Sequence, residues 1–122
     1  MDRKILVVDD EKLVRWSIQK SMGQKECKVV SAANGAEAME KIEQEHFDLI
    51  ITDLVMPGFN GIEVARRARE IQPDAKIVMM TAYGSVLDKE EARSAGVLSF
   101  INKPFMVNEV RSVVQELLSE NT

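Results

Sequence analysis

Residues 4–12, KILVVDDEK, place four consecutive apolar residues directly before three acids. A strand with one solvent-facing side would alternate apolar and polar residues, so residues 5–8 predict a strand that is buried on both faces. Asp9, Asp10 and Glu11 follow without a spacer. Adjacent buried carboxylates repel one another and lose their hydration, so we expect another group to offset their charge.

The composition indicates one folded domain over residues 1–122. Hydrophobic residues make up 45% of the chain and charges are interspersed, which is typical of a globular protein with a real core. The net charge of −4 disfavours direct binding to nucleic acid or to anionic membranes. No apolar run is long enough to span a bilayer, and acids follow the first apolar run too early for a signal peptide.

The few cysteine and histidine residues limit the kinds of site that are possible. Cys27 is the single cysteine, which excludes an internal disulfide and favours a cytoplasmic location. Together with one histidine, His46, it cannot form a usual zinc site, and we expect His46 at the surface. A cluster of three arginines is interpreted as the solvated face of a helix rather than as an anion site: Arg66, Arg67 and Arg69. Any metal site must therefore use oxygen ligands.

Strand-like and helix-like segments alternate along the chain. Strands are expected at residues 4–8, 28–32, 47–52, 76–80 and 97–101. Helices are expected at about 12–22, 36–45, 61–71, 86–95 and 107–119. Five such units predict an α/β fold, in which a parallel sheet carries helices on both faces and the crossovers are right-handed.

Apolar residues at helical spacing predict which side of each helix is buried. The last helix has the clearest stripe: Val107, Val110, Val113, Val114, Leu117 and Leu118. The first helix has a shorter stripe, and Trp16 lies off it: Leu13, Val14, Ile18 and Met22. The fourth helix has the weakest apolar pattern.

Charged or hydroxyl-bearing residues follow four of the five predicted strands: Asp9 and Asp10, then Asp53, then Thr81, then Lys103, with Pro104 directly after it. In a flavodoxin-like sheet with the strand order 2-1-3-4-5, these strand ends share one edge, and the order reverses between strands one and three. Neighbouring strands lie about 4.8 Å apart, so Asp10 and Asp53 should face each other across the crevice. Oxygen ligands without cysteine or histidine point to Mg²⁺ as the bound cation.

Four motifs in this order resemble the receiver domain of bacterial two-component response regulators: ILVVDDE, DLIITDLVMPGFNG, IVMMTAYG and FINKPF. The resemblance covers nearly the whole chain. It implies that Asp53 is the phosphoacceptor, which attacks a phosphohistidine on a sensor histidine kinase. It also implies that Mg²⁺ is held by Asp10, by Asp53 and by the backbone carbonyl of Val55, while Asp9 acts through a water molecule.

The resemblance assigns further roles around the phosphoryl group. Lys103 would pair with its oxygens, the Thr81 hydroxyl would turn toward it, and the backbone N–H of Ala82 would lie beside it. Phe100 occupies the place of the switch aromatic, and the peptide bond before Pro104 would be cis. Such a domain is regulatory and not an enzyme, because it assists only its own phosphorylation and slow dephosphorylation.

Phosphoryl transfer spreads charge over three oxygens, so positioning and charge neutralisation carry most of the catalysis. Asp53 as nucleophile would form an acyl phosphate, with Mg²⁺ and Lys103 supplying positive charge. After Asp53, Pro57 predicts a rigid turn, and Gly58 and Gly61 allow flexible geometry.

Taken singly, these residues have plainer explanations. Asp9 or Asp10 could cap a helix, and Glu11 fits a surface acid near a helix N-terminus better than a ligand. Asp53 could be a loop acid, Thr81 a helix cap and Lys103 a solvated lysine. Phe100 could belong to the core, as aromatic residues on strands usually do. Jointly, their order and spacing favour a functional site.

Two functions from other classes remain as alternatives. A haloacid-dehalogenase-like phosphatase has a second acid two residues after its nucleophile, and Val55 occupies that position here. A pseudo-receiver would fold without accepting phosphate, but such proteins usually lack part of the site. Phosphorylation by a small-molecule donor would separate the three.

We expect phosphorylation to change the surface formed by the fourth helix, the fifth strand and the fifth helix, and so to pass the signal on. By resemblance, this surface would form a homodimer or bind an output domain. The segments VVDDEKLVRWSIQ and TDLVMPGFNGIEV most resemble receivers of enhancer-binding transcription activators, which predicts a role in transcription regulation. A stand-alone receiver in a phosphorelay is the alternative, and the chain could be part of a longer regulator.

Overall fold

Five parallel strands form one sheet in the computed structural model, which describes residues 3–22, 27–56, 58–82 and 86–119. The strands are β1 (Arg3–Val8), β2 (Cys27–Ala32), β3 (Leu49–Asp53), β4 (Lys76–Thr81) and β5 (Val97–Asn102). The helices are α1 (Lys12–Met22), α2 (Gly35–Gln44), α3 (Gly61–Ile71), α4 (Val86–Ser94) and α5 (Val107–Ser119). All ten predicted elements are present in these residues, with ends that agree with the prediction or differ from it by at most two positions. The turn predicted at Pro57 lies outside the described residues.

The strand order is β2-β1-β3-β4-β5, which confirms the predicted flavodoxin-like topology. The register pairs Val8 of β1 with Thr52 of β3, and Thr81 of β4 with Asn102 of β5. The residues that follow each of these strands therefore meet at one edge of the sheet.

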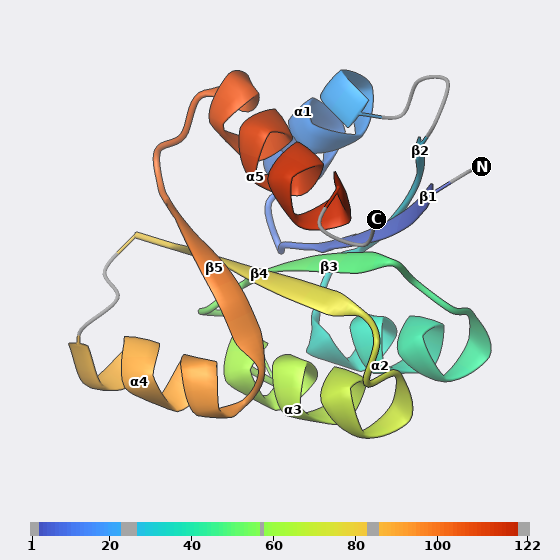
Figure 1. The fold of residues 1–122 in the computed structure, drawn as a ribbon, viewed down its shortest axis with the longest axis vertical. Helices are drawn as coiled ribbons and strands as arrows, with labels where there is room; N and C mark the ends of the chain where they lie inside the picture. The colour runs from blue at the N-terminus through green and yellow to red at the C-terminus, as the bar shows by residue number, and fades with distance from the viewer. Residues whose placement is uncertain (1–2, 23–26, 57, 83–85, 120–122) are drawn as a thin grey trace.

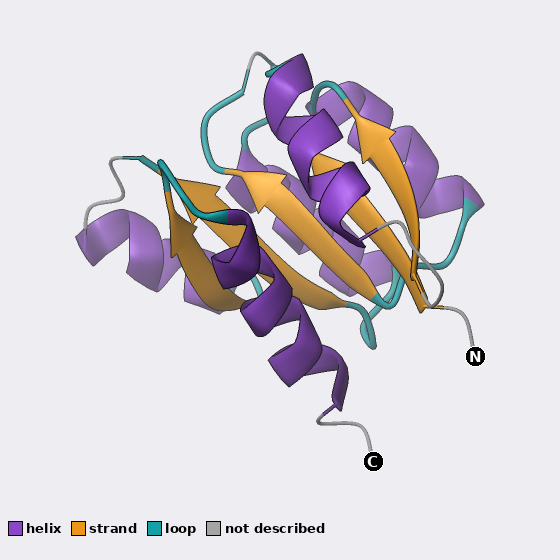
Figure 2. Ribbon diagram, turned by 90° about the horizontal axis from the view of Figure 1, so that it is seen from above, coloured by secondary structure: helices purple, strands orange, loops and turns teal. Residues whose placement is uncertain are grey.

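Helices cover both faces of the sheet, as Figures 1 and 2 show, with α1 and α5 on one face and α2, α3 and α4 on the other. The side chains of β1 divide between the two layers, as the pleat of a strand requires. Ile5 and Val7 pack with residues of α1 and α5, while Leu6 and Val8 pack with residues of α2 and α3. All four are fully buried, which confirms a strand covered on both sides. No helix in the described ranges is long and apolar enough to cross a bilayer.

The start of β3 differs from the prediction, which placed it at Phe47. Phe47 is fully buried, but its backbone N–H donates to the side-chain oxygen of Gln72 at 2.8 Å instead of to a neighbouring strand. The Gln72 amide nitrogen donates to the carbonyls of Ile42 and Glu45 at 2.7 and 2.6 Å. One buried glutamine from the end of α3 thus joins the end of α2 to the segment that enters β3.

The predicted helix stripes are correct except at their first residues. Ile18 and Met22 of α1 are buried, as are four residues of α5: Val110, Val114, Leu117 and Leu118. Leu13 is 71% exposed, however, and Val107 is 38% exposed, so their assignment to the core was wrong. His46 is exposed, as predicted, and Trp16, which lies off the apolar stripe of α1, is exposed as well.

Candidate functional site

Asp53 is the last residue of β3, and only 7% of its surface is exposed. Its Oδ2 accepts a hydrogen bond from Lys103 Nζ at 3.1 Å. The chain after Asp53 is held in place because Leu54 N–H donates to the Met80 carbonyl of β4 at 3.0 Å. A Cβ on Gly61 would lie 2.2 Å from the Asp53 carbonyl oxygen, so only glycine lets the start of α3 come this close. Gly61 is therefore required for the close packing of α3 beneath Asp53.

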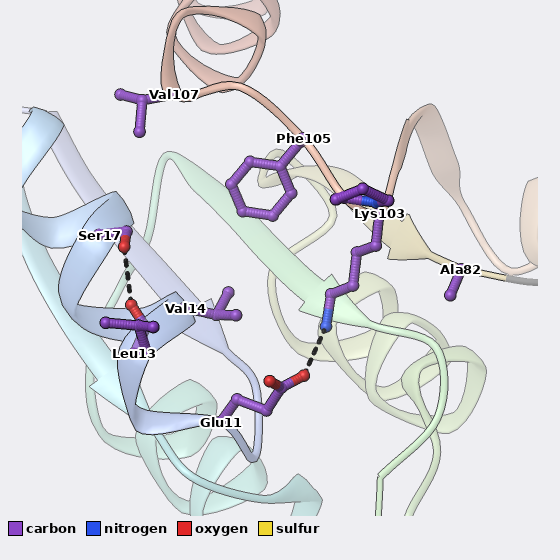
Figure 3. A pocket seen from close by; sticks show the side chains of 9 residues that line it. Glu11, Leu13, Val14, Ser17, Ala82, Lys103, Phe105 and Val107 are labelled. Carbon is purple, nitrogen blue, oxygen red and sulfur yellow. Dashed lines mark hydrogen bonds and ion pairs between the residues drawn. The ribbon is translucent and has the colours of Figure 1, made fainter.

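Lys103 donates hydrogen bonds to two of the three aspartates of the site, Asp9 and Asp53. Its Nζ donates to Asp9 Oδ2 at 2.7 Å and lies 3.7 Å from Glu11 Oε1. The contact with Glu11, which is exposed, can be followed in Figure 3. Lys103 N–H also donates to the Thr81 carbonyl at 2.9 Å, so the lysine is tied to the end of β4.

Asp9 and Asp10 occupy different surroundings. Asp9 is fully buried, and its Oδ1 accepts a hydrogen bond from Glu11 N–H at 2.8 Å, directly before α1. Arg15 holds the same residue from the helix, because its guanidinium donates to the Asp9 carbonyl at 2.7 Å. Asp10 is exposed. Neither aspartate is the N-cap of α1, because the N–H groups of Val14 and Arg15 donate to the Glu11 carbonyl. Asp9 instead accepts from the backbone N–H of Glu11, just before the helix.

The three aspartates can together hold a hard cation. One carboxylate oxygen from each of Asp9, Asp10 and Asp53 lies within 4.8 Å of the others. Carboxylates are the ligands that Mg²⁺ prefers, and an all-oxygen set disfavours softer metals. The donor set therefore fits the predicted Mg²⁺.

Burial and neighbouring charges together shift the pKa values of Asp53 and Lys103. Burial raises the pKa of Asp53 above its ordinary value and the Asp9 carboxylate adds to this, although Lys103 and the Val55 backbone N–H oppose it. Burial alone would lower the pKa of Lys103, but hydrogen bonds and attraction from Asp9 and Asp53 outweigh it, so its pKa is raised. The lysine thus stays charged beside an acid that is costly to ionise in the metal-free protein.

The other predicted site residues lie around this centre. Thr81 is buried at the end of β4, and Ala82 is exposed directly after it. Val55 follows Asp53 by two positions, and its side chain is exposed. The peptide bond between Lys103 and Pro104 is cis, as the resemblance implied. Phe100 does not meet the acids, because it lies on β5 beneath α4, in register with Met79.

A mainly apolar groove of about 670 Å³ opens beside Lys103, between the start of α1 and the β5–α5 connection (Figure 3). Nine residues line it: Glu11, Leu13, Val14, Ser17, Ala82, Lys103, Pro104, Phe105 and Val107. No pattern in the sequence predicted this groove. The exposed apolar residues at the first turns of α1 and α5 were the available signal, but their helical spacing assigned them to the core.

Comparison with known proteins identifies the class to which this fold and site belong. The family model of the response regulator receiver domain matches residues 5–115, and the chain therefore belongs to that family. A solved CheY-like receiver domain from Methanospirillum hungatei JF-1 superposes with a TM-score of 0.94 at 29% identity, over 98% of this chain and 96% of that one.

Two curated relatives differ in how much of their length is matched. Sporulation initiation phosphotransferase F of Bacillus subtilis is 33% identical over 97% of this chain and 95% of that protein. The DNA-binding transcriptional regulator NtrC of Azospirillum brasilense is 32% identical over 97% of this chain but only 24% of that protein. The chain is thus similar both to a whole small protein and to one part of a longer regulator.

Proposed function

We propose that this chain is a phosphorylation-dependent signalling switch that accepts a phosphoryl group on Asp53 from a sensor histidine kinase. The observation that carries the proposal is the buried Asp53 carboxylate, hydrogen-bonded to Lys103 and grouped with Asp9 and Asp10. Membership of the receiver family supports the same assignment.

The residues of the site have separate parts in the phosphoryl transfer. An Asp53 oxygen attacks phosphorus, the bond from phosphorus to the kinase histidine nitrogen breaks, and an acyl phosphate forms. Lys103 places its ammonium group beside Asp53 and so neutralises charge on the phosphoryl oxygens. The Thr81 hydroxyl and the Ala82 backbone N–H are the next donors along the same edge.

Asp10 and Asp53, with the Val55 carbonyl, would hold Mg²⁺ directly, and Asp9 would act through water. The ion would supply positive charge to the phosphoryl oxygens. The partners that Asp9 already has, Lys103 and the Glu11 N–H, are consistent with an indirect role for this carboxylate.

The output passes from Thr81 through Phe100 to the surface formed by α4, β5 and α5. A phosphoryl group offers the Thr81 hydroxyl a charge-assisted hydrogen bond. Movement of Thr81 would leave space that Phe100, on the neighbouring strand, can fill. The repositioned surface would then form a homodimer or bind an output domain in transcription regulation, without turnover of an external substrate.

The test of the site is labelling by acetyl phosphate with Mg²⁺. Asp53→Asn should abolish labelling, because the amide cannot act as the nucleophile. Asp74→Asn removes an exposed carboxylate remote from the site and should label like wild type. Undiminished labelling of the Asp53→Asn protein would reject the assignment. Rapid turnover of the donor would instead indicate a phosphatase, and no uptake by wild type would indicate a pseudo-receiver.

A further inference from the structure

Two cations of α4 lie against the ring of Phe100. Lys89 Nζ is 5.6 Å from the ring centroid, and Arg93 Cζ is 5.3 Å from it. Both distances fall within the range in which a cation is attracted to the face of an aromatic ring. Because they are four residues apart, the two side chains emerge from the same side of the helix. One ring of β5 is therefore contacted by two successive turns of α4.

These contacts matter because α4 has little apolar attachment where its side chains are described. Among residues 88–94, Ala92 is the buried side chain. Phe100 itself is half-buried and packs against the core cluster that contains Ala92. The ring thus contacts both the core and the two cations of α4.

We propose that Lys89 and Arg93 are positioning residues that hold Phe100 at the boundary between α4 and β5, and so stabilise the resting state of the switch. The inference rests on the proposed function, in which Phe100 leaves this position when Asp53 is phosphorylated. Departure of the ring would forfeit both cation–π contacts. The two cations therefore set how much of the protein occupies the active state before phosphorylation.

The size of the effect follows from the strength of such contacts. A cation–π contact at an exposed site corresponds to about a twofold to fivefold change in an equilibrium constant. Removing both should raise the active population by more than either single removal and by at most about thirtyfold, because two contacts that share one ring are not fully additive. When the active state is the minor one, the apparent affinity for an activating ligand rises by the same factor.

The experiment titrates beryllofluoride, a stand-in for the phosphoryl group, in the presence of Mg²⁺. The response is followed by the ¹⁹F resonance of fluorophenylalanine at position 100 and by the amide resonance of Ala92. Arg93→Gln should lower the beryllofluoride concentration at half response about twofold to fivefold, and the Lys89→Gln, Arg93→Gln double variant should lower it further. Loss of positive charge alone would weaken anion binding, which is the opposite sign.

Arg66→Gln is the matched control. Arg66 pairs with Glu91 of α4 at 3.2 Å, so this variant removes one cation and one contact of α4 without touching Phe100. We expect it to leave the half-response concentration unchanged or to raise it slightly, because it removes a positive charge but no contact with Phe100. The effect of the double variant should also disappear in a Phe100→Leu background, where the Ala92 amide is the readout.

The outcomes separate this inference from the proposed function. If position 100 of the wild type does not respond to beryllofluoride, the proposed switch is wrong. If it responds but the double variant titrates like wild type, the role of Lys89 and Arg93 is wrong and the switch stands. An equal shift with Arg66→Gln, or a shift that persists with Phe100→Leu, would mean that α4 is loosened in general, and it would also overturn the inference.

Discussion

Asp9 and Asp10 are neighbours in the sequence, but the structure gives their carboxylates different environments. Asp9 is buried and bonded to Lys103 and Glu11, whereas Asp10 is exposed at the same end of the sheet. Successive residues at the end of a strand point in opposite directions, so one of the pair can serve the fold while the other faces the crevice. The two acids should therefore differ in their effect on stability.

In the metal-free protein, Asp9→Asn should lower the melting temperature and Asp10→Asn should raise it. Asp9→Asn weakens a buried charge-assisted hydrogen bond, a loss on the order of 2 kcal/mol. For a domain of this size the midpoint would fall by roughly 8 °C. Asp10→Asn removes a charge that Asp9 and Asp53 repel and should raise the midpoint by a few degrees.

Thermal unfolding in the presence of a chelator measures both variants. Added Mg²⁺ should stabilise wild type more than Asp10→Asn, because a ligand of the native state stabilises it by mass action. A metal-free Asp10→Asn protein that melts below wild type would show that this carboxylate has structural partners, against our interpretation.

At the scale of secondary structure elements, Gln72 forms a junction between α2, α3 and the segment before β3 that no sequence pattern predicted. Gln72→Leu should leave the Phe47 N–H and two carbonyls without their side-chain partner. Unsatisfied buried groups cost about 1–3 kcal/mol each, so we expect a loss of at least 2 kcal/mol. The midpoint of urea unfolding should fall accordingly. Gln44→Leu, at an exposed position of α2, should have little effect. Equal midpoints for wild type and Gln72→Leu would show that the Gln72 hydrogen bonds do not stabilise the fold.

Helical periodicity predicted the elements well and failed at the ends of two of them. The buried stripes of α1 and α5 hold where the helices lie over the sheet, because packing decides those positions. Leu13 and Val107 continue the same spacing into the first turns, where they line the groove beside Lys103 instead of the core. Periodicity reports which side of a helix is apolar, but it cannot report where the sheet beneath that side ends.

At the scale of the whole molecule, the strand order could be predicted, and with it the edge on which the site lies. Five alternating units and the polar residues after four strands were sufficient, because parallel strands share one carboxyl edge. Close approaches between distant segments could not be predicted. A Cβ on Gly35 would lie 2.5 Å from Phe59 Cβ, which ties the β3–α3 connection to the start of α2. Such contacts depend on side-chain placement that no local pattern encodes.

The charge of the site makes the stability of the whole chain depend on pH. Because burial raises the pKa of Asp53, the folded protein binds more protons than the unfolded chain between the ordinary and the raised pKa. The free energy of unfolding of the metal-free protein should therefore decrease as the pH rises through that window. The decrease is complete above the raised pKa. Asp53→Asn removes this titration. The melting temperature of Asp53→Asn relative to wild type should rise from pH 4 to pH 7 in a chelator.

Differential scanning calorimetry of both proteins across this range measures the effect. Asp74→Asn is the control, because this exposed carboxylate should leave the difference from wild type constant. Mg²⁺ at pH 7 should narrow the gap between wild type and Asp53→Asn, since the ion offsets the charge of the ionised carboxylate in wild type alone. A gap that is the same at every pH, and that Mg²⁺ leaves unchanged, would mean that ionised Asp53 is already fully compensated by Lys103 at 3.1 Å. The cation would then be needed for the phosphoryl group and not for the resting fold.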